Sequence, residues 1–431
     1  MENKIFRNNI RKICIKIIKR ERNSMKQNLK FLIISTGIII LFGTLIVILY
    51  DEPTIRYYVG ISTGLKDEPI LIDDKFKLEK FVVGIKSSTA LTIIDDYVIF
   101  LEKESGKVRL IDNGELLDEP LWDFQIRKEG CECYTESGLL GITHYKSKIY
   151  IYVTEEIDES KFSNNIYVFD WRNQTLQNPE LLNSLPAVDN EHHGGALVSD
   201  NDGNIFAVIG DQNLESSLVN SENGENSDVG IILKVGIEEK IKKPSNSLNP
   251  DKHFHGVGIR NSFGLAIDPF TNNLWITENG THEFDEINLA LPNYNSGWVK
   301  ILGPASNDEL KNFKGYPGYV YSDPEFSWEK TIAPTGISFV DEKWGSYKNN
   351  VYVGDCRGNL YKFQLNDSRD ELIFENQDLQ DLILNDEDSS EEIIFGKNFG
   401  CITDVEYNQN DGYLYIISYL NNGAIYKIIP K

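Results

Sequence analysis

Short runs that alternate apolar and polar residues recur along the chain and predict paired β-strands. Six stretches share one pattern, a strand, a polar turn and a second strand, and they begin at Ala90, Gly138, Gly194, Phe263, Thr335 and Ile402. A third strand usually follows, as in NNIYVFD, GIILKV, GNLYKFQL and GAIYKII. Units that repeat at roughly 50 to 70 residues are typical of propeller blades. The pattern therefore predicts an all-β protein with a six-bladed β-propeller over residues 76–431.

The last of these units has only three strands before the chain reaches Lys431. FKLEKFVVGI, from Phe76, is strand-like and belongs to no other unit, so we expect it to supply the fourth strand of the last blade and to close the ring. A sandwich or two smaller β domains is the alternative, and six similar units make it the weaker one. Two polar insertions, 213–228 and 366–392, interrupt the pattern. The second holds eleven acidic residues and one Arg, and we expect solvated surface there.

The N-terminal region has a different composition. Residues 31–50 contain no charge and are long enough to cross a bilayer as a helix. Residues 1–30 hold ten Lys or Arg against two Glu, whereas Asp51 and Glu52 follow the apolar run, so the positive-inside rule predicts a cytoplasmic segment at 1–30 and an external domain. A cleaved signal peptide is disfavoured by the long apolar run and by the absence of a small-residue cleavage pattern. Residues 51–75 have the composition of a tether.

The charge of the external part argues against nucleic acid. The whole chain carries −23 and residues 1–50 carry +8, so residues 51–431 carry −31. A domain this acidic repels DNA and RNA, which we therefore exclude as partners. The Asn-X-Ser/Thr sequences at Asn173 and Asn366 are possible attachment sites for sugar in an exported domain.

The stretch from Gly258 to Trp298 concentrates polar residues at the ends of two strand-like runs, where binding chemistry usually lies. It reads GIRNSFGLAIDP, then a TENG…DEINL run, then NSGW. Together with EHHGGALV and ITDVEYNQNDGYLYIIS, these motifs resemble the glucose/sorbosone dehydrogenase family over roughly residues 76–431. The family consists of six-bladed quinoprotein propellers. The resemblance implies an enzyme that binds pyrroloquinoline quinone (PQQ) and calcium at the top of the central channel and oxidises a sugar at its anomeric carbon.

The resemblance also assigns roles to individual residues. His192 matches the general base that takes the hydroxyl proton as hydride leaves for the quinone, a role suited to a neutral imidazole. Arg260 and Asn261 match the pair that contacts the quinone carbonyls, where a fixed cation stabilises developing charge. Taken singly, each has a structural alternative. Arg260 could join two blades through an acidic neighbour, and a His beside two Gly is often a turn residue.

The calcium site implied by the resemblance follows in the same stretch. Gly280 and Thr281 match the two residues whose backbone carbonyls hold the ion, which prefers oxygen ligands. Asp285 matches an acidic position beside that site. The structural alternative is that Asp285 and Glu286 only solvate the end of a strand.

Several positions depart from the family pattern. Cys356 stands where quinone-binding members have a Lys, and Cys401 and Thr403 stand where they have two Arg. Ala196 replaces the Arg of an HxxGR motif, and Glu136 takes a cofactor-binding position that holds an amide in the family. PQQ carries three carboxylates, and each basic partner contributes a charge-assisted hydrogen bond of roughly 1.5 to 3 kcal/mol. The replacements therefore remove cofactor anchors that the family uses.

The cysteines after the apolar run are four, and in the propeller alignment all of them come from loops at one channel mouth: Cys131, Cys133, Cys356 and Cys401. An even number in an exported domain favours two disulfides, with Cys356 to Cys401 as the first pairing to test. The alternative is a thiolate site for copper or zinc with histidines nearby, namely His192, His193, His253 or His255. Cys-X-Cys is not a common zinc spacing.

Two classes of function follow from these observations. The first is a membrane-tethered aldose dehydrogenase that uses PQQ and calcium and passes electrons to an external acceptor. The second is a catalytically silent propeller that binds a glycan or a protein at the cell surface, with a disulfide or a metal at the channel mouth. The substitutions at the basic positions favour the second class, and the match at His192, Arg260 and Asn261 favours the first.

Overall fold

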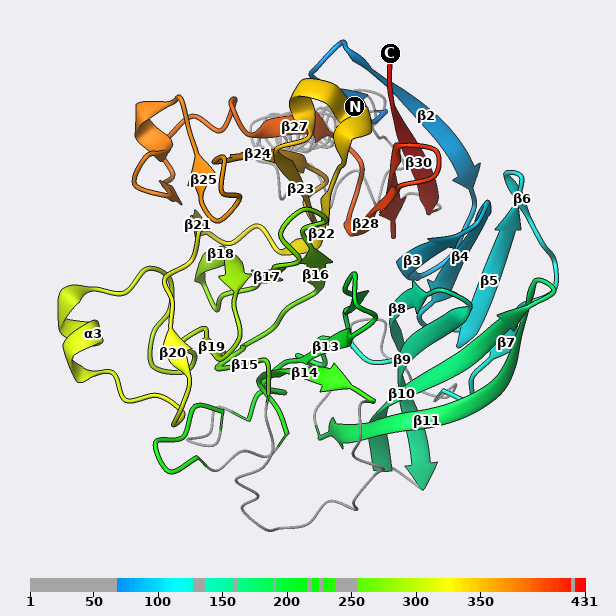
Figure 1. Ribbon diagram of the computed structural model, residues 1–431, viewed down its shortest axis with the longest axis horizontal. Helices are drawn as coiled ribbons and strands as arrows, with labels where there is room; N and C mark the ends of the chain where they lie inside the picture. The colour runs from blue at the N-terminus through cyan, green and yellow to red at the C-terminus, as the bar shows by residue number, and fades with distance from the viewer. Residues whose placement is uncertain are drawn as a thin grey trace, which may run out of the picture. The chain divides into compact units, whose positions relative to one another are not determined.

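The structure is a computed structural model that describes residues 68–126, 136–158, 161–188, 191–214, 219–224, 228–236, 254–419 and 423–431. These residues form a β-propeller of six sheets with very little helix, which confirms the prediction of an all-β propeller (Figure 1). The expected membrane helix at 31–50 lies outside the described residues. Within the described part, no helix combines the length and the apolar character needed to cross a membrane.

The first three sheets follow one another in chain order. The first sheet contains β3 (Ser88–Ile94), β4 (Tyr97–Glu102), β5 (Lys107–Asp112), β6 (Glu115–Leu116) and β7 (Trp122–Asp123). The second contains β8 (Leu139–Tyr145), β9 (Lys148–Asp158), β10 (Lys161–Arg172) and β11 (Thr175–Ala187). The third contains β12 (Leu197–Ser199), β13 (Ile205–Ile209), β14 (Ile231–Val235), β15 (Gly256–Val257), β19 (Tyr294–Asn295) and β20 (Val320–Tyr321).

The other three sheets complete the ring. The fourth contains β16 (Gly264–Ile267), β17 (Leu274–Glu278), β18 (Glu283–Ala290), β21 (Phe326–Lys330) and β26 (Ile383–Leu384). The fifth contains β22 (Pro334–Phe339), β23 (Asn350–Asp355), β24 (Leu360–Leu365), β25 (Leu372–Ile373), β27 (Ile394–Lys397) and β1 (Ile70–Leu71). The sixth contains β28 (Ile402–Asn408), β29 (Tyr413–Ser418), β30 (Ala424–Pro430) and β2 (Phe76–Val83).

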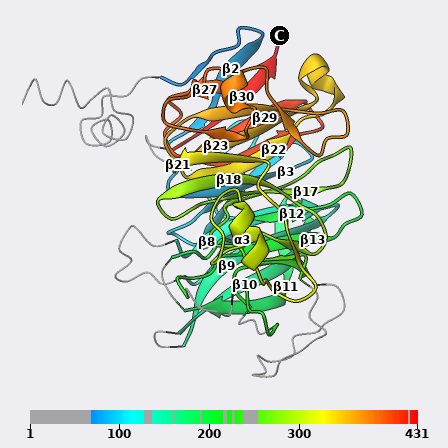
Figure 2. The same ribbon diagram turned by 90° about the vertical axis from the view of Figure 1, so that its left-hand side faces the viewer.

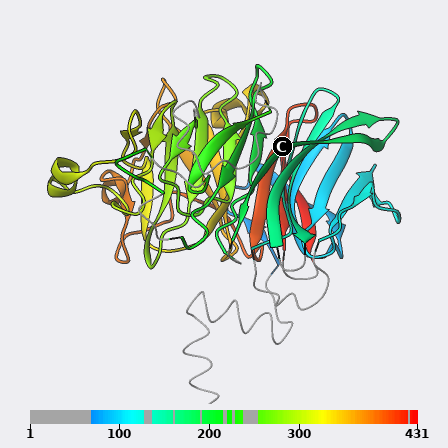
Figure 3. The same cartoon turned by 90° about the horizontal axis from the view of Figure 1, so that it is seen from below.

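The first strand of each predicted repeat lies innermost. In the order β3, β8, β12, β16, β22 and β28, each of these strands contacts the next, and β28 contacts β3 again. Figure 3 shows the strands from the side, running across the thickness of the ring. The short helix α3 (Asn307–Asn312) lies at the outer edge of the propeller (Figure 1), on the side that faces the viewer in Figure 2. The 3-10 turn η1 (Glu342–Tyr347) connects β22 to β23, and η2 (Gln377–Leu379) lies between β25 and β26.

The ring closes through a strand from the beginning of the propeller. β2 pairs antiparallel with β30, from Phe76 opposite Pro430 to Val83 opposite Ala424. The predicted fourth strand of the last blade is therefore confirmed. One boundary was wrong, because Ile70 and Leu71 form β1 and pair with β27. The end of the expected tether at 51–75 is thus part of the fifth sheet.

Aspartates close several of the hairpins. The Asp200 carboxylate accepts the backbone N–H of Asn204 at 2.7 Å, and Asp355 accepts that of Asn359 at the same distance. A short acceptor side chain that bonds the backbone two to four residues ahead stabilises a turn. The core fills the spaces between neighbouring sheets, as where Trp328 of the fourth sheet meets Phe363 of the fifth edge to face with ring centroids 5.7 Å apart.

The insertion at 366–392 is not entirely solvated surface. Its single arginine, Arg369, is buried and donates to both carboxylate oxygens of the fully buried Asp268, at 2.7 and 2.8 Å. The guanidinium also stacks over Phe270, 4.5 Å from the ring centre. This ion pair fastens the acidic insertion of the fifth sheet to the fourth, so the prediction of a solvated segment is wrong for Arg369.

Candidate active site

The candidate site lies where the chain enters the innermost strands. Glu136 comes shortly before β8, His192 before β12, Arg260 and Asn261 before β16, and Cys401 directly before β28. Because every innermost strand begins on the same face of a propeller, these entry loops converge at one end of the channel. The hydrogen bonds described next show that Glu136, His192 and Asn261 meet there.

A carboxylate orients the predicted base. His192 Nδ1 lies 2.6 Å from Asp211 Oδ1, and the indole Nε1–H of Trp298 donates to Asp211 Oδ2 at 2.7 Å. An ionised carboxylate only accepts hydrogen bonds, so Nδ1 of a neutral His192 carries the proton and Nε2 keeps its lone pair. His192 has φ +57°, an uncommon conformation for a residue with a side chain. The strained backbone and the paired carboxylate are typical of a functional histidine.

A glycine allows the two central loops to approach. A Cβ atom at Gly210 would lie 2.4 Å from the carbonyl oxygen of His192 and 2.6 Å from that of Arg260. Any side chain at this position would therefore separate the loop that carries the base from the loop that carries the Arg-Asn pair.

Glu136 bridges the same two loops. Its carboxylate accepts the backbone N–H of His192 at 2.5 Å and the side-chain amide of Asn261 at 3.3 Å. Burial raises the pKa of Glu136, while the neighbouring His192 opposes the rise. Asn261 keeps one buried atom, Oδ1, without a partner in the described structure. A buried polar atom left open beside a histidine base points to a ligand that would donate to it.

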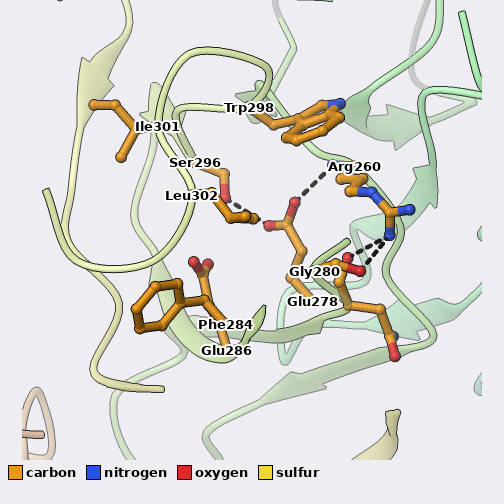
Figure 4. Close-up of a pocket in the computed structure, with 10 residues that line it drawn as sticks. Arg260, Glu278, Gly280, Phe284, Glu286, Ser296, Trp298, Ile301 and Leu302 are labelled. Carbon is orange, nitrogen blue, oxygen red and sulfur yellow. Dashed lines mark hydrogen bonds between the residues drawn. The ribbon is translucent and has the colours of Figure 1, made fainter. Parts of the chain in front are cut away.

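Arg260 is held in place from three sides. Its backbone N–H donates to Glu278 Oε1 at 2.6 Å, and its guanidinium donates to the carbonyls of Asn279 at 2.8 Å and Gly280 at 2.7 Å (Figure 4). The guanidinium also lies over the Trp298 ring, 5.6 Å from its centre. Trp298 thus links the cation to Asp211 and the base.

Two further acids face the pocket beside Arg260 and were not predicted as site residues. Glu278 and Glu286 are directly opposite each other in the pairing of β17 with β18, and both side chains line the pocket (Figure 4). Burial raises the pKa of Glu278 to about 7 and that of Glu286 to about 8, and in Glu286 the charge of Glu278 adds to the rise. The sequence signal was present, because both residues sit in the quoted TENG…DEINL run, but their opposition depends on the register of the hairpin.

Gly280, Thr281 and Asp285, the residues expected at the calcium site, already have other contacts or lie at the surface. The Gly280 carbonyl accepts from Arg260, and Thr281 is exposed. Asp285 is buried and accepts three backbone N–H groups, from Gly280 at 2.8 Å, Ile332 at 2.6 Å and Ala333 at 2.8 Å. It therefore anchors the loop below Gly280, and burial raises its pKa. In the described part of the chain, no three His, Cys, Asp or Glu side chains gather as metal ligands.

The cysteines separate into two groups. Cys356 and Cys401 are joined by a disulfide, the pairing expected first, which connects the end of β23 to the start of β28. Two thiolates for a metal site are thereby removed, and this part of the metal alternative is wrong. Cys131 and Cys133 lie outside the residues that the structure describes, as does His253.

The remaining histidines and replaced positions have partners within the fold. His193 Nδ1 lies 3.1 Å from Asn164 Oδ1, and His255 Nε2 lies 2.7 Å from the carbonyl oxygen of Ala290. The Thr403 hydroxyl bonds to backbone carbonyls at 3.1 and 3.5 Å, and Ala196 packs against apolar side chains between the third and fourth sheets.

These residues fit one end of the implied cofactor. The Arg260 guanidinium is a donor and suits a quinone carbonyl oxygen, whereas His192 Nε2 and the open Oδ1 of Asn261 are acceptors and suit the hydroxyl groups of a substrate. At the positions expected to bind its carboxylates, the chain instead has the Cys356–Cys401 disulfide and a threonine hydroxyl that is already bonded. Among the residues that the structure describes, the site therefore offers a cation for a quinone oxygen and lacks the basic side chains that the resemblance implies for the carboxylates.

The structure is thus a β-propeller with a histidine, a carboxylate and an arginine in loops at one end of its channel. Residues 85–427 match the pattern of the family described as Glucose / Sorbosone dehydrogenase, so the chain belongs to that family and the resemblance seen in the sequence is confirmed. The chain is 25% identical over 270 residues to the aldose sugar dehydrogenase YliI of Escherichia coli, a match that covers 61% of this chain and 65% of that protein.

The chain is also similar to a second bacterial dehydrogenase in sequence and to two solved dehydrogenase structures in fold. The quinoprotein glucose dehydrogenase B of Acinetobacter calcoaceticus is 26% identical over 269 residues, covering 55% of this chain and 53% of the relative. The apo structure of the soluble aldose sugar dehydrogenase of E. coli superposes with a TM-score of 0.64 at 20% identity, covering 83% of this chain and all of that chain. The PQQ-bound aldose sugar dehydrogenase of Streptomyces coelicolor gives 0.60 at 18%, covering 83% and 99%. These two structures support the fold.

Proposed function

We propose that the protein is a sugar dehydrogenase that oxidises an aldose at its anomeric carbon. The observation that carries the proposal is the pairing of His192 with Asp211 at 2.6 Å, beside Arg260 and Asn261, in a chain of the glucose/sorbosone dehydrogenase family. A base that is oriented by a buried carboxylate, beside loops that carry Arg260 and Asn261, is the arrangement needed to remove a hydroxyl proton.

In this mechanism, Nε2 of His192 accepts the proton of the anomeric hydroxyl. Asp211 holds the imidazole in the tautomer that leaves Nε2 free and stabilises the imidazolium that forms, and Trp298 fixes Asp211. Arg260 places a cation where negative charge develops, and Asn261 offers an open acceptor. A quinone bound by these residues would supply the acceptor for the hydride.

Calcium would bind, in this proposal, to the carbonyls of Gly280 and Thr281. The Arg260 guanidinium would then have to leave the Gly280 carbonyl, which it contacts in this structure. One carbonyl oxygen in contact with both the guanidinium and the ion would hold two cations close together, and they repel each other. Asp285 would keep its role as the support of this loop.

The proposed setting is the cell surface. The uncharged run at 31–50 supports a single membrane-spanning helix, and the basic residues before it support a cytoplasmic N-terminus with the propeller outside. Electrons would then pass to an acceptor outside the cell. Accessibility of the propeller to protease in intact cells tests this orientation, and a protected propeller contradicts it.

The activity is tested by incubating the full-length protein with quinone and Ca²⁺ and measuring dye reduction with several aldoses. We expect turnover that falls at least about a hundred-fold in His192→Ala, the low end of what a general base contributes. Asp211→Asn should reduce turnover while substrate binding changes little, because the substitution alters the tautomer of the base. Wild-type protein that binds quinone and sugar without turnover would refute the proposal.

One observation favours a second function. The Cys356–Cys401 disulfide stands at two positions for which the family resemblance implies cationic anchors, which suits a catalytically silent propeller that binds a glycan. Glycan binding by the wild type that is unchanged in His192→Ala, together with no dye reduction, would support this function over the first.

A further inference from the structure

The polar groups that meet beside the predicted base are hydrogen-bond acceptors. Nε2 of His192 keeps its lone pair, because Nδ1 faces the Asp211 carboxylate at 2.6 Å. Asn261 is 3% exposed, and its Oδ1 atom is buried without a partner in the described structure. Glu136 contacts both His192 and Asn261, and an ionised carboxylate only accepts hydrogen bonds. A ligand that binds at this point must therefore bring several donors.

Glu136 and Asn261 form one recognition unit. The Asn261 amide donates to both carboxylate oxygens of Glu136 at 3.3 Å, so Nδ2 faces the carboxylate and Oδ1 lies at the other corner of the same planar amide. The backbone N–H of His192 bonds to Oε2 of Glu136, which leaves Oε1 with fewer partners. Two side chains in direct contact therefore each have an oxygen that can accept a further hydrogen bond.

A protonated amine matches these two acceptors better than a hydroxyl group does. A hydroxyl group donates one hydrogen bond, whereas an ammonium group donates up to three and can reach a carboxylate oxygen and an amide oxygen together. The bond to the carboxylate is then charge-assisted and roughly twice as strong as a bond between neutral groups. Glu136 stands where the family resemblance implies an amide, which carries no charge to attract an ammonium group.

The charges around Glu136 favour the same kind of ligand. Burial raises the pKa of Glu136, because the carboxylate has been removed from water. The charge of a protonated His192 and, to a smaller extent, that of Lys103 oppose this rise. The Arg260 guanidinium is held by two backbone carbonyls instead of by Glu136. A cation that binds to Glu136 would stabilise its ionised form further, whereas a neutral sugar would not.

We infer that the substrate is an amino sugar, an aldose that carries a protonated amino group, and that Glu136 and Asn261 bind this group. The inference rests on the proposed function and names the substrate class of that same site. The reaction is unchanged: the anomeric hydroxyl gives its proton to Nε2 of His192, the anomeric C–H bond breaks with transfer of hydride to the quinone, and the anomeric carbon becomes a lactone carbonyl. The amino group keeps all its bonds.

The test compares three sugars that differ in one substituent. Glucosamine carries an ammonium group, glucose a hydroxyl group and N-acetylglucosamine a neutral amide at the same carbon. Full-length protein with quinone and Ca²⁺ should oxidise glucosamine with a kcat/KM at least about ten-fold above that of either other sugar, since one charge-assisted hydrogen bond contributes about that factor. Most of the gain should appear in KM. The cost of removing the ammonium group from water limits the preference.

Glu136→Gln separates charge from shape. Glutamine keeps an acceptor for the His192 N–H and removes the negative charge. The ratio of kcat/KM for glucosamine to that for glucose should fall at least about ten-fold in this variant, and the ratio cancels any effect that both sugars share. Glu283→Gln, which removes an exposed carboxylate at the start of β18, is the matched control and should keep the wild-type ratio.

The outcomes are distinct. Equal kcat/KM for glucosamine and glucose would overturn the inference and leave the sugar dehydrogenase proposal intact. Equal values for glucosamine and N-acetylglucosamine, or a ratio that Glu136→Gln leaves unchanged, would also overturn it. No turnover of any of the three sugars by the folded, quinone-bound wild type would overturn both proposals. If Glu136→Gln fails to fold, the comparison of the three sugars on the wild type still decides.

Discussion

Replacing Glu286 by Gln should make the protein more stable, and by an amount that grows with pH. Glu286 is 6% exposed, and burial together with the charge of Glu278 raises its pKa from 4.5 to about 8. The folded state therefore holds a proton that the unfolded state has already released between about pH 4.5 and 8. The contribution of Glu286 to the free energy of unfolding is fully present below this pH range and is lost as the pH rises through it.

The magnitude follows from the two pKa values. A change from 4.5 to about 8 corresponds to a loss of about 5 kcal/mol above pH 8, and about 3 kcal/mol of it is already lost at pH 7. Glutamine cannot ionise, so the variant avoids this loss. Its amide also has a partner, because Asn288 Oδ1 is buried without a hydrogen bond and can accept once the Asn288 amide rotates.

The assay is urea denaturation of wild type and Glu286→Gln at intervals between pH 5 and 9. The two proteins should differ by less than about 1 kcal/mol near pH 5, and the variant should be more stable by several kcal/mol at pH 8 and above. Glu283→Gln, at the exposed start of the same strand, is the matched control and should follow the wild type. Parallel curves for wild type and Glu286→Gln across the whole range would refute the reasoning.

Two further predictions concern Arg369 and Trp298. Arg369→Ala should lower the free energy of unfolding, measured by urea denaturation, by about 3 to 5 kcal/mol, because it leaves the carboxylate of Asp268 buried without its ion pair. Arg369→Lys should recover part of this loss. A decrease below about 1 kcal/mol in Arg369→Ala would contradict the prediction. Trp298→Phe should reduce dehydrogenase turnover about ten-fold with little change in KM, because it removes the N–H bond that holds Asp211. Trp344→Phe removes an indole bond to a backbone carbonyl and should leave turnover unchanged, so equal effects in both variants would contradict a positioning role for Trp298.

The strands of the propeller could be predicted from the sequence because their signal is local. Alternation of apolar and polar residues reports which side of a strand is buried, and six similar units imply that each sheet packs against the next. Even the closing strand at Phe76 could be assigned, since the last unit has three strands and one strand was left over. The location of His192 and the first choice of disulfide came from the family resemblance instead.

The partners of the site residues were decided only by the tertiary structure. Asp211, which follows β13, binds His192, which precedes β12, and Glu278 meets Glu286 through the register of two strands. Arg369 reaches Asp268 across 101 residues of sequence. No local pattern identifies such pairs, because hydrogen bonds and buried charges depend on which loops the closed ring brings together. The sequence by itself determined the strands and their repetition, and the geometry of the ring determined which polar groups share a buried, weakly screened environment.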